Sequence, residues 1–420
     1  MNSRFPLAVS TWGDEELDAM KKVIDSGIFT MGKNVNDFEQ SFSKFIDSEY
    51  CVMVNSGSSA NLLMIAALFF KKEKPLQRGD EVIVPAVSWS TSYFPLQQYG
   101  LKLRFVDIDI ESLNFDLEQL EAAITPKTKL ILAVNLLGNP NDFKTINEII
   151  YGTDIILLED NCESLGAIFQ EKYAGTYGLM GSFSTFFSHH ISTMEGGLIV
   201  TDNKEIYHIL LTLRAHGWTR NLPHINEIVG EKSKDAFDES FRFVLPGYNV
   251  RPLELEGAIG LEQLKKLPSL ISERRKNGIN FQKSMEGHPD LMIQKEIGQS
   301  SWFGFSIVIR QSSSIARSQL NDRLLKLGFE TRPIVSGDFS RKEVMKYFHF
   351  EVPFQMKNAE YIDNKGLFVG NHHFPMNEAI EKISQIKSIV EFNIGHFLIG
   401  ESIFIGLKEF KTKFKKIIKQ

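Results

Sequence analysis

The stretch YCVMVNSGSSANLLMIAALFFKK, residues 50–72, predicts a short buried strand that leads directly into a helix. Its first part, Tyr50–Ser56, is mostly apolar and carries no charge, as is typical of strands covered on both faces of a parallel sheet. The following segment, residues 58–72, is too long for a strand and fits a helix. A strand followed by a helix in this way is the repeating unit of α/β folds.

The same unit recurs through the first half of the chain. Further strands are predicted at residues 81–87, 103–108, 130–138, 154–160, 182–187 and 197–202. Helical segments fall between them, for example from Asp116 onward. This alternation predicts a layered α/β domain with a largely parallel sheet and helices on both faces.

The second half of the chain has a different character. The segment NVRPLELEGAIGLEQLKKLPSLISERRKNG, residues 249–278, predicts a long helix with a proline near Leu267. A strand at 302–309, a helix at 318–328 and loops up to about residue 389 are predicted after it. We therefore expect a large α/β domain with an N-terminal arm over residues 1–250, and a smaller α+β domain over residues 251–390.

The last segment, residues 391–420, predicts a basic amphipathic helix. Apolar residues recur at Leu407, Phe410, Phe414 and Ile417, and lysines lie among them. The segment fits a contact with a membrane surface or a partner, or else a terminal helix that packs on the body or frays in solvent. The second interpretation is favoured because such patterns are common at chain ends, so membrane contact is not expected.

The composition excludes several classes of protein. With 420 residues and a net charge of −5, the chain has no global field that attracts nucleic acid, and no nucleic-acid partner is expected. Two cysteines, Cys51 and Cys162, are too few for an iron–sulfur cluster or a four-cysteine zinc site, and they argue against a disulfide framework. The N-terminal residues lack a secretory pattern and no apolar run reaches membrane-spanning length, so we expect a cytoplasmic protein.

Small polar residues follow several of the predicted strands. Gly57, Ser58 and Ser59 stand where a strand ends and a helix begins, and their N–H groups and hydroxyls could hold a phosphate; a plain helix cap is the alternative. Ser184, on a later strand, could give the same phosphate another hydroxyl. These positions matter because ligands of open α/β sheets bind at the carboxyl edge of the strands.

Two further residues at strand ends indicate a bound ring. Asp160 ends a buried strand, where its carboxylate could keep a ring nitrogen protonated, or could simply cap a helix. Trp89 follows another strand and could stack on such a ring, or could pack in the core.

A histidine pair occupies the turn of GSFSTFFSHHISTMEGGLIVTD, residues 181–202. His189 can move protons, because the unperturbed pKa of an imidazole lies close to neutral pH. His189 and His190 are adjacent, so their side chains diverge, and the same holds for His372 and His373. We therefore expect no metal site.

These motifs occur in a fixed order: SGSSAN, WST, EDNCES, SFSTFFSHHISTMEGG, RAHG and GYNVRPLE. In that order they resemble the DegT/DnrJ family of sugar-nucleotide aminotransferases, over about residues 5–390. The resemblance implies an aspartate aminotransferase-like fold of type I, with a mostly parallel mixed sheet and a smaller C-terminal domain. It also implies pyridoxal 5′-phosphate as cofactor and a homodimer whose active sites straddle the subunit interface.

The resemblance assigns roles to residues of this chain. The implied cofactor-binding residues are Gly57, Ser58, Ser59, Trp89, Asp160, Glu163, Ser184 and Asn249. Within this set Asp160 would pair with the pyridine nitrogen and Trp89 would stack on the ring. Asn249 would reach the phosphate in the neighbouring subunit.

Two departures from the family pattern change the expected reaction. The family's Schiff-base lysine aligns with His189, which cannot hold the cofactor aldehyde covalently, and a family glutamine is replaced by Glu163. Two anions would meet where Glu163 contacts the phenolic oxygen of the cofactor, so one shared proton is expected there. Both departures are shared with one branch of the family, the dehydratases that remove the 3-hydroxyl of 4-keto-6-deoxy sugar nucleotides.

The resemblance to that branch implies a GDP-linked 4-keto-6-deoxy sugar of the mannose series as substrate, on the colitose route of O-antigen synthesis. Pyridoxamine 5′-phosphate would be bound noncovalently and regenerated by L-glutamate, and His189 would act as base and then as acid without any iron–sulfur cluster. The candidates for binding the sugar-nucleotide diphosphate are His216, Arg220, Arg251 and Arg332. Solvated loop residues are the alternative for these four. A sugar-nucleotide aminotransferase and a catalytically inactive cofactor-binding protein remain the alternative functions.

Overall fold

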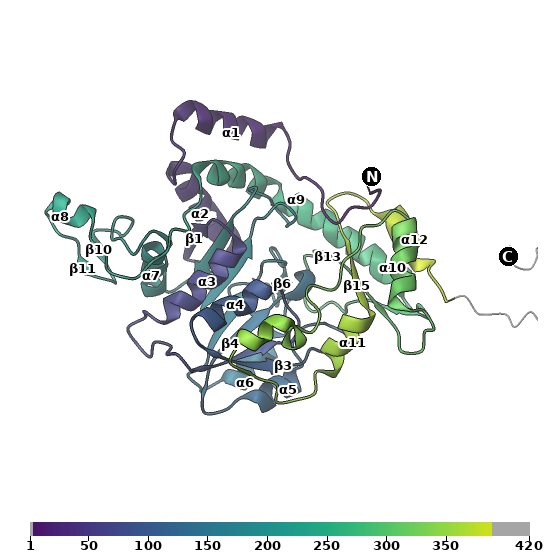
Figure 1. Ribbon diagram of the computed structural model, residues 1–420. Helices are drawn as coiled ribbons and strands as arrows, with labels where there is room; N and C mark the ends of the chain where they lie inside the picture. Colours follow the sequence, from purple (N-terminus) through teal and green to yellow (C-terminus); the bar gives the residue numbers. More distant parts are fainter. Residues whose placement is uncertain (1–2, 389–420) are drawn as a thin grey trace, which may run out of the picture. The chain divides into compact units, whose positions relative to one another are not determined.

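In the computed structural model, which describes residues 3–388, the first half of the chain builds most of an eight-stranded sheet (Figure 1). The strands lie in the order β1-β9-β8-β5-β4-β2-β3-β14. Their bounds are β1 (Tyr50–Val54), β2 (Glu81–Pro85), β3 (Lys102–Val106), β4 (Thr128–Val134), β5 (Ile156–Asp160), β8 (Met180–Ser184), β9 (Gly197–Thr201) and β14 (Phe350–Glu351). β9 is antiparallel to both of its neighbours, and the other neighbouring pairs are parallel. The seven predicted strands and the mostly parallel mixed sheet are confirmed.

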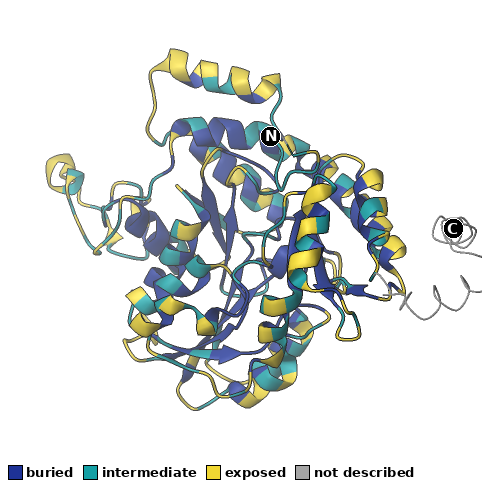
Figure 2. Ribbon diagram, turned by 45° about the vertical axis from the view of Figure 1, so that its right-hand side comes forward, coloured by how far each residue is buried: buried dark blue, intermediate teal, exposed yellow. Residues whose placement is uncertain are grey.

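Alternate side chains of each strand enter different cores, because successive residues of a strand point to opposite faces. Val52 and Val54 pack with α3, α4 and α7, whereas Cys51 and Met53 pack with α2 and α9. Farther along the sheet, α5 and α6 cover the same face as α2. The bounds of these helices are α2 (Lys33–Ile46), α3 (Gly57–Leu68), α4 (Ser90–Gln98), α5 (Leu117–Ala123), α6 (Phe143–Ile150) and α7 (Lys204–Arg214). Figure 2 shows the strands buried between the two helix layers, as the apolar strand sequences predict.

The longest helix, α9 (Glu254–Met285), packs against α2 and against the N-terminal helix α1 (Asp14–Ser26). It contains Pro268, so the predicted long helix with a proline is confirmed. Gly260 allows the close approach of α2, because a Cβ atom at this position would lie 2.6 Å from the ring of Phe38. The packing holds the N-terminal arm beside the large sheet.

After α9 the chain forms a second, antiparallel sheet in the order β12-β13-β15. The elements of this region are β12 (Leu291–Met292), β13 (Gly304–Ile309), α10 (Arg317–Lys326), α11 (Lys357–Lys365), β15 (Gly366–Gly370) and α12 (Asn377–Ser384). β13 and α10 confirm the strand and the helix predicted here. The prediction of loops up to about residue 389 is wrong, because α11, β15 and α12 lie there. β15 is short and is defined by its pairing with β13, a contact between distant segments that the local sequence does not reveal.

Smaller elements complete the described chain. They are the hairpins β6 (Ile168–Phe169) with β7 (Lys172–Tyr173) and β10 (Ile225–Asn226) with β11 (Gly230–Glu231), the helix α8 (Ala236–Ser240), and the 3-10 helices η1 (Leu136–Gly138), η2 (Phe339–Arg341) and η3 (Glu343–Tyr347). Residues up to Gln385 form one compact unit, and the division expected near residue 250 stays a prediction. The amphipathic segment expected at 391–420 lies outside the described residues. None of the helices within residues 3–388 has the length and apolar run needed to cross a bilayer.

Candidate active site

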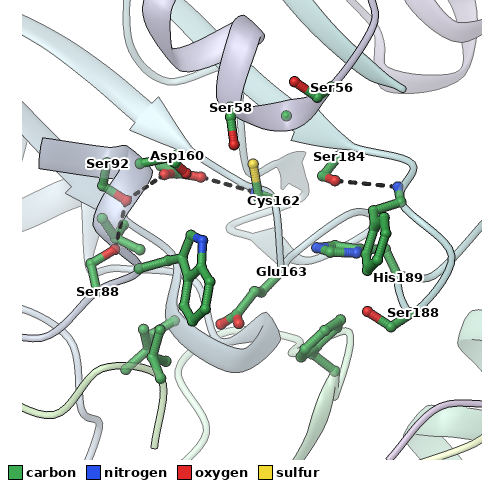
Figure 3. A pocket seen from close by; sticks show the side chains of 18 of the residues that line it. Ser56, Ser58, Ser88, Ser92, Asp160, Cys162, Glu163, Ser184, Ser188 and His189 are labelled. Atoms are coloured by element: carbon green, nitrogen blue, oxygen red, sulfur yellow. Dashed lines mark hydrogen bonds between the residues drawn. The ribbon is translucent and has the colours of Figure 1, made fainter. Parts of the chain in front are cut away.

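Five parallel strands end at one edge of the large sheet, and a cavity of about 380 Å³ opens there (Figure 3). The segments that follow β1, β2, β4, β5 and β8 form most of its wall, and the turn before the reversed strand β9 joins them. Phe303, Arg332 and Val335 close the cavity from the part of the chain after α9. The cavity therefore lies where open α/β sheets bind ligands, as the sequence predicts.

Small residues form the wall of the cavity where α3 begins. Ser56 caps the helix, because its Oγ accepts the N–H of Ser59 at 3.1 Å. Ser59 is used in this cap and does not line the cavity, whereas Gly57 and Ser58 do. The N–H groups of a first helical turn have no partner within the helix and are available to an anion. A Cβ atom at Gly57 would lie 2.6 Å from Cβ of Ser184, so only glycine leaves this cradle open.

Asp160 is the last residue of β5 and is only 5% exposed. Its Oδ2 accepts hydrogen bonds from Ser92 Oγ at 2.7 Å and from Asn61 Nδ2 at 2.8 Å. Its Oδ1 accepts the N–H of Cys162 at 3.1 Å, and Asp160 lines the cavity. The next element along the chain is the strand β6, so the alternative in which Asp160 caps a helix is wrong.

Aromatic side chains border the same cavity. Trp89 precedes α4 and is 58% exposed, so the alternative of a core tryptophan is wrong. Phe186 is 42% exposed and Phe303 is buried, and both line the cavity with Trp89. These rings can pack on a planar ligand.

His189 projects into the cavity from the turn between β8 and β9 (Figure 3). Its imidazole packs against Phe303 with ring centroids 5.3 Å apart, and its buried Nδ1 has no hydrogen-bond partner in the part of the chain that the structure describes. Burial, together with the positive charge of Arg332, lowers the pKa of His189 from 6.5 to about 3. The ring is therefore neutral at physiological pH, which is the form that accepts a proton.

Glu163 and Arg332 face the same cavity. Glu163 Oε2 accepts the N–H of Leu137 at 3.1 Å. Burial raises the pKa of Glu163 and the charge of Arg332 opposes that rise, so the protonated carboxyl is more favoured here than in water. The guanidinium of Arg332 lies 4.5 Å from the ring centre of Phe368, and its Nε is buried without a partner.

Besides Ser59, four of the predicted site residues do not line this cavity: Asn249, His216, Arg220 and Arg251. They lie on the segment between α7 and α9. Asn249 Oδ1 accepts a hydrogen bond from Arg251 Nε at 3.0 Å. His216 and Arg220 both pack on the ring of Trp218. The predicted residues thus form two clusters, one in the cavity wall and one on this segment.

Several residues of the cavity wall were missed by the sequence reasoning. They are Ser56, Ser88, Thr91, Ser92, Val134, Leu136, Cys162, Phe186, Ser188, Glu195, Phe303 and Val335. Most of them flank a predicted residue, so taking every residue just after each strand would have found them. Phe303 follows a turn in which Trp302 has a positive φ of 49°, and nothing in its local sequence links it to His189.

The histidine pairs do not build a metal centre. Among residues 3–388 no group of three or more histidine, cysteine, aspartate or glutamate side chains could hold a metal ion. His190 is buried and its Nε2 bonds to the carbonyl of Ser301 at 3.1 Å. His372 Nε2 similarly bonds to the carbonyl of Pro6 at 2.9 Å.

Known proteins are similar in sequence to this chain over most of its length. Residues 10–386 match the model of the DegT/DnrJ/EryC1/StrS aminotransferase family. GDP-4-keto-6-deoxy-D-mannose 3-dehydratase of Yersinia pseudotuberculosis is 61% identical over 383 residues, which cover 91% of this chain and 98% of the relative. The protein of the same name from Escherichia coli O55:H7 is 60% identical, over 91% of this chain and 99% of its own.

Solved structures of such enzymes have the same fold. GDP-4-keto-6-deoxymannose-3-dehydratase with a trapped PLP–glutamate geminal diamine superposes with a TM-score of 0.90 at 60% identity, covering 91% of this chain and 99% of that one. A histidine-to-asparagine variant of this enzyme with bound GDP-perosamine also has a TM-score of 0.90 at 60% identity, with the same coverage. These structures confirm the expected aminotransferase fold of type I.

The depressed pKa of His189 predicts a pH-dependent stability. The pKa of His189 is near the ordinary value of 6.5 in the unfolded chain and about 3 in the folded chain, so the folded state loses stability as the pH falls through this window. Urea midpoints of the cofactor-free protein should fall between about pH 7 and about pH 5, and fall less in His189→Gln. Burial also lowers the pKa of His190 and of His372, and their contribution to the fall in stability is the same in both proteins. Equal falls in both would contradict a neutral, buried His189.

Proposed function

The chain belongs to the DegT/DnrJ/EryC1/StrS aminotransferase family, and from this premise we propose that it is a sugar-nucleotide 3-dehydratase. It removes the 3-hydroxyl of GDP-4-keto-6-deoxy-D-mannose and yields GDP-4-keto-3,6-dideoxy-D-mannose. Pyridoxamine 5′-phosphate is the cofactor, held without a covalent bond, and L-glutamate is the amino donor. The product serves dideoxysugar and O-antigen synthesis, on the colitose route.

The observation that carries this proposal is the side chain at position 189. No lysine lies among the described residues that line the cavity, and His189 stands there instead. The lysines nearest to it in sequence, Lys172 and Lys204, are both exposed and outside the cavity wall. An aminotransferase of this family needs an amine that reaches the cofactor aldehyde, so the aminotransferase alternative lacks its essential group.

The cavity has donors and acceptors that fit pyridoxamine phosphate. The cradle beside Gly57, with Ser58 and Ser184, offers N–H groups and hydroxyls to a phosphate. Asp160 presents a buried carboxylate to a ring nitrogen, and Trp89 presents an exposed ring for stacking. When bound, the cofactor supplies an amine for the sugar ketone and a protonated ring that accepts electrons.

His189 moves the proton in the proposed reaction. Neutral at physiological pH, its imidazole accepts a proton from the 4′ carbon of the cofactor. As an imidazolium it then gives the proton to the departing 3-hydroxyl. A bound anion raises the pKa of a neighbouring imidazole, which moves His189 toward the range where it can both accept and release a proton.

Glu163 and Arg332 complete the proposed chemistry in the cavity. The raised pKa of Glu163 favours a carboxyl that donates its proton to a phenolate oxygen. Arg332 places a guanidinium where it can bind phosphate oxygens of the sugar nucleotide.

We propose a homodimer in which each subunit completes the site of the other. Two pairs of exposed aromatic residues support this. One pair, Phe186 and Phe187, lies in the turn that carries His189, and the other, Phe241 and Phe243, precedes α9. Their exposed fractions are between 42% and 65%. Exposed aromatic residues at this density are typical of interfaces. In the dimer Asn249 binds the partner's cofactor phosphate, and His216, Arg220 and Arg251 are candidates for the diphosphate there. The cytoplasm is the proposed compartment.

Replacing the proton carrier tests the reaction. His189→Asn keeps a side chain of similar shape but cannot carry the proton, so ammonia release from GDP-4-keto-6-deoxymannose and glutamate should fall about 10²–10⁴-fold. Binding of the cofactor, measured by fluorescence, should change little.

His373→Asn provides the matched control, because His373 lies outside the cavity wall. It should retain full activity. Unchanged turnover in His189→Asn would exclude the assigned role, and transfer of the amino group to the sugar by the unmodified enzyme would favour an aminotransferase. Cofactor binding without either reaction would favour the inactive alternative.

Mixing two defective proteins tests the shared site. Asn249→Asp places a like charge beside the phosphate proposed for it, so this variant should bind cofactor poorly. An equal mixture with His189→Asn, allowed to exchange subunits, should regain about a quarter of the wild-type activity. Half of the dimers then contain one subunit of each variant, and each of these mixed dimers has one intact site out of two. No recovery in a mixture shown to exchange would place Asn249 in its own subunit's site.

A further inference from the structure

The carboxylate of Asp160 accepts hydrogen bonds from side chains of two different helices. Ser92 in α4 donates to Oδ2 at 2.7 Å (Figure 3). Asn61 in α3 donates to the same atom at 2.8 Å. Both donors are at most 2% exposed. A carboxylate buried to this degree is expected to have its oxygens satisfied by neighbouring donors.

The direction of each bond follows from its partners. An ionised carboxylate can only accept, so the hydroxyl proton of Ser92 points to Asp160. Ser88 Oγ lies 2.7 Å from Ser92 Oγ and must therefore donate to it. On the other side Ser182 Oγ donates to Asn61 Oδ1 at 2.6 Å, which turns the Nδ2 group of Asn61 toward Asp160.

The two carboxylate oxygens are consequently unlike. Oδ2 accepts hydrogen bonds from two side chains, whereas within residues 3–388 the bond found for Oδ1 is that from the N–H of Cys162 at 3.1 Å. Oδ1 therefore keeps acceptor capacity that a ligand in the cavity lined by Asp160 can use, and the bonds from Ser92 and Asn61 to Oδ2 oppose rotation of the carboxylate.

We propose that Ser92 and Asn61 are positioning residues: they fix Oδ2, present Oδ1 to the ring nitrogen of the cofactor and keep the shared proton on that nitrogen. The inference rests on the proposed function, because it needs pyridoxal or pyridoxamine phosphate in the cavity. Its physical basis is that hydrogen bonds to the charged form of a carboxylate favour that form. Without them the carboxylate attracts the proton more strongly and the ring loses its positive charge, which weakens it as an electron acceptor.

Other titratable groups near Asp160 do not replace these donors. Cys162, Glu163 and Tyr93 each have a raised pKa, first because of burial and also because of the negative charge of Asp160. The negative charge of Asp160 affects all three, whereas the side-chain donors to Oδ2 among the described residues are Ser92 and Asn61. The serine and asparagine donors therefore determine how Asp160 faces the cavity.

The test measures the protonation of the bound cofactor ring. Full-length protein is loaded with ¹⁵N-labelled pyridoxal phosphate, and the nitrogen chemical shift is followed against pH. The ring of the wild type should be protonated at neutral pH. In Ser92→Ala the deprotonation midpoint should fall by about one pH unit or more, a tenfold change in the proton equilibrium, and cofactor affinity should fall about tenfold.

A series of variants separates positioning from general damage. Ser92→Cys keeps the shape of the side chain with a weaker donor and should give an intermediate midpoint. Ser88→Ala removes only the donor to Ser92 and should shift the midpoint less, in the same direction. The control is Ser306→Ala, which removes a buried hydroxyl in β13 that accepts the N–H of Gln294. This variant should behave as the wild type.

The outcomes distinguish this inference from the function on which it rests. A wild-type midpoint in both Ser92→Ala and Ser88→Ala overturns the positioning role while the dehydratase proposal stands. A wild-type protein that fails to bind the cofactor, or binds it with an unprotonated ring, overturns the proposed function itself. An equal fall in cofactor affinity in Ser306→Ala and Ser92→Ala would mean that the loss of any buried hydroxyl weakens binding by destabilising the protein. That result would also overturn the inference.

Discussion

The carboxylate of Asp160 is the point on which the site depends. It ends β5 at the carboxyl edge of the sheet, and its partners Ser92 and Asn61 come from the helices that follow two other strands. A buried charge is costly unless neighbouring groups bond to it. The bonds hold α3 and α4 at the end of β5, so that Gly57 and the ring of Trp89 line the same cavity.

The chemistry follows from what stands on the far side of that cavity. A lysine amine could capture the cofactor aldehyde covalently, whereas His189 offers a nitrogen that can carry a proton but form no lasting bond to an aldehyde. Burial against Phe303 and the charge of Arg332 keep this imidazole neutral. The fold of an aminotransferase can thus serve removal of a hydroxyl, because one exchanged side chain removes covalent capture and leaves proton transfer.

Much of this arrangement was predictable from the sequence because it depends on local patterns. Apolar runs predicted seven of the eight strands of the large sheet, and residues placed at or just after strand ends, such as Asp160 and Trp89, do meet in the cavity. Contacts between distant segments were not predictable. Asn61 and Ser92 have no local feature that marks them as partners of Asp160, and Phe303 reaches His189 through a strained turn at Trp302. β15 was missed for the same reason, since it is defined by pairing with β13.

The central claim is that no amine of this chain captures the cofactor. Treating the cofactor-loaded protein with borohydride and weighing the intact chain tests it directly, since a Schiff base is reduced to a permanent bond and a noncovalent complex is not. The account predicts the mass of the unmodified 47.8 kDa chain after denaturation. A stable gain of one cofactor on a lysine would contradict it.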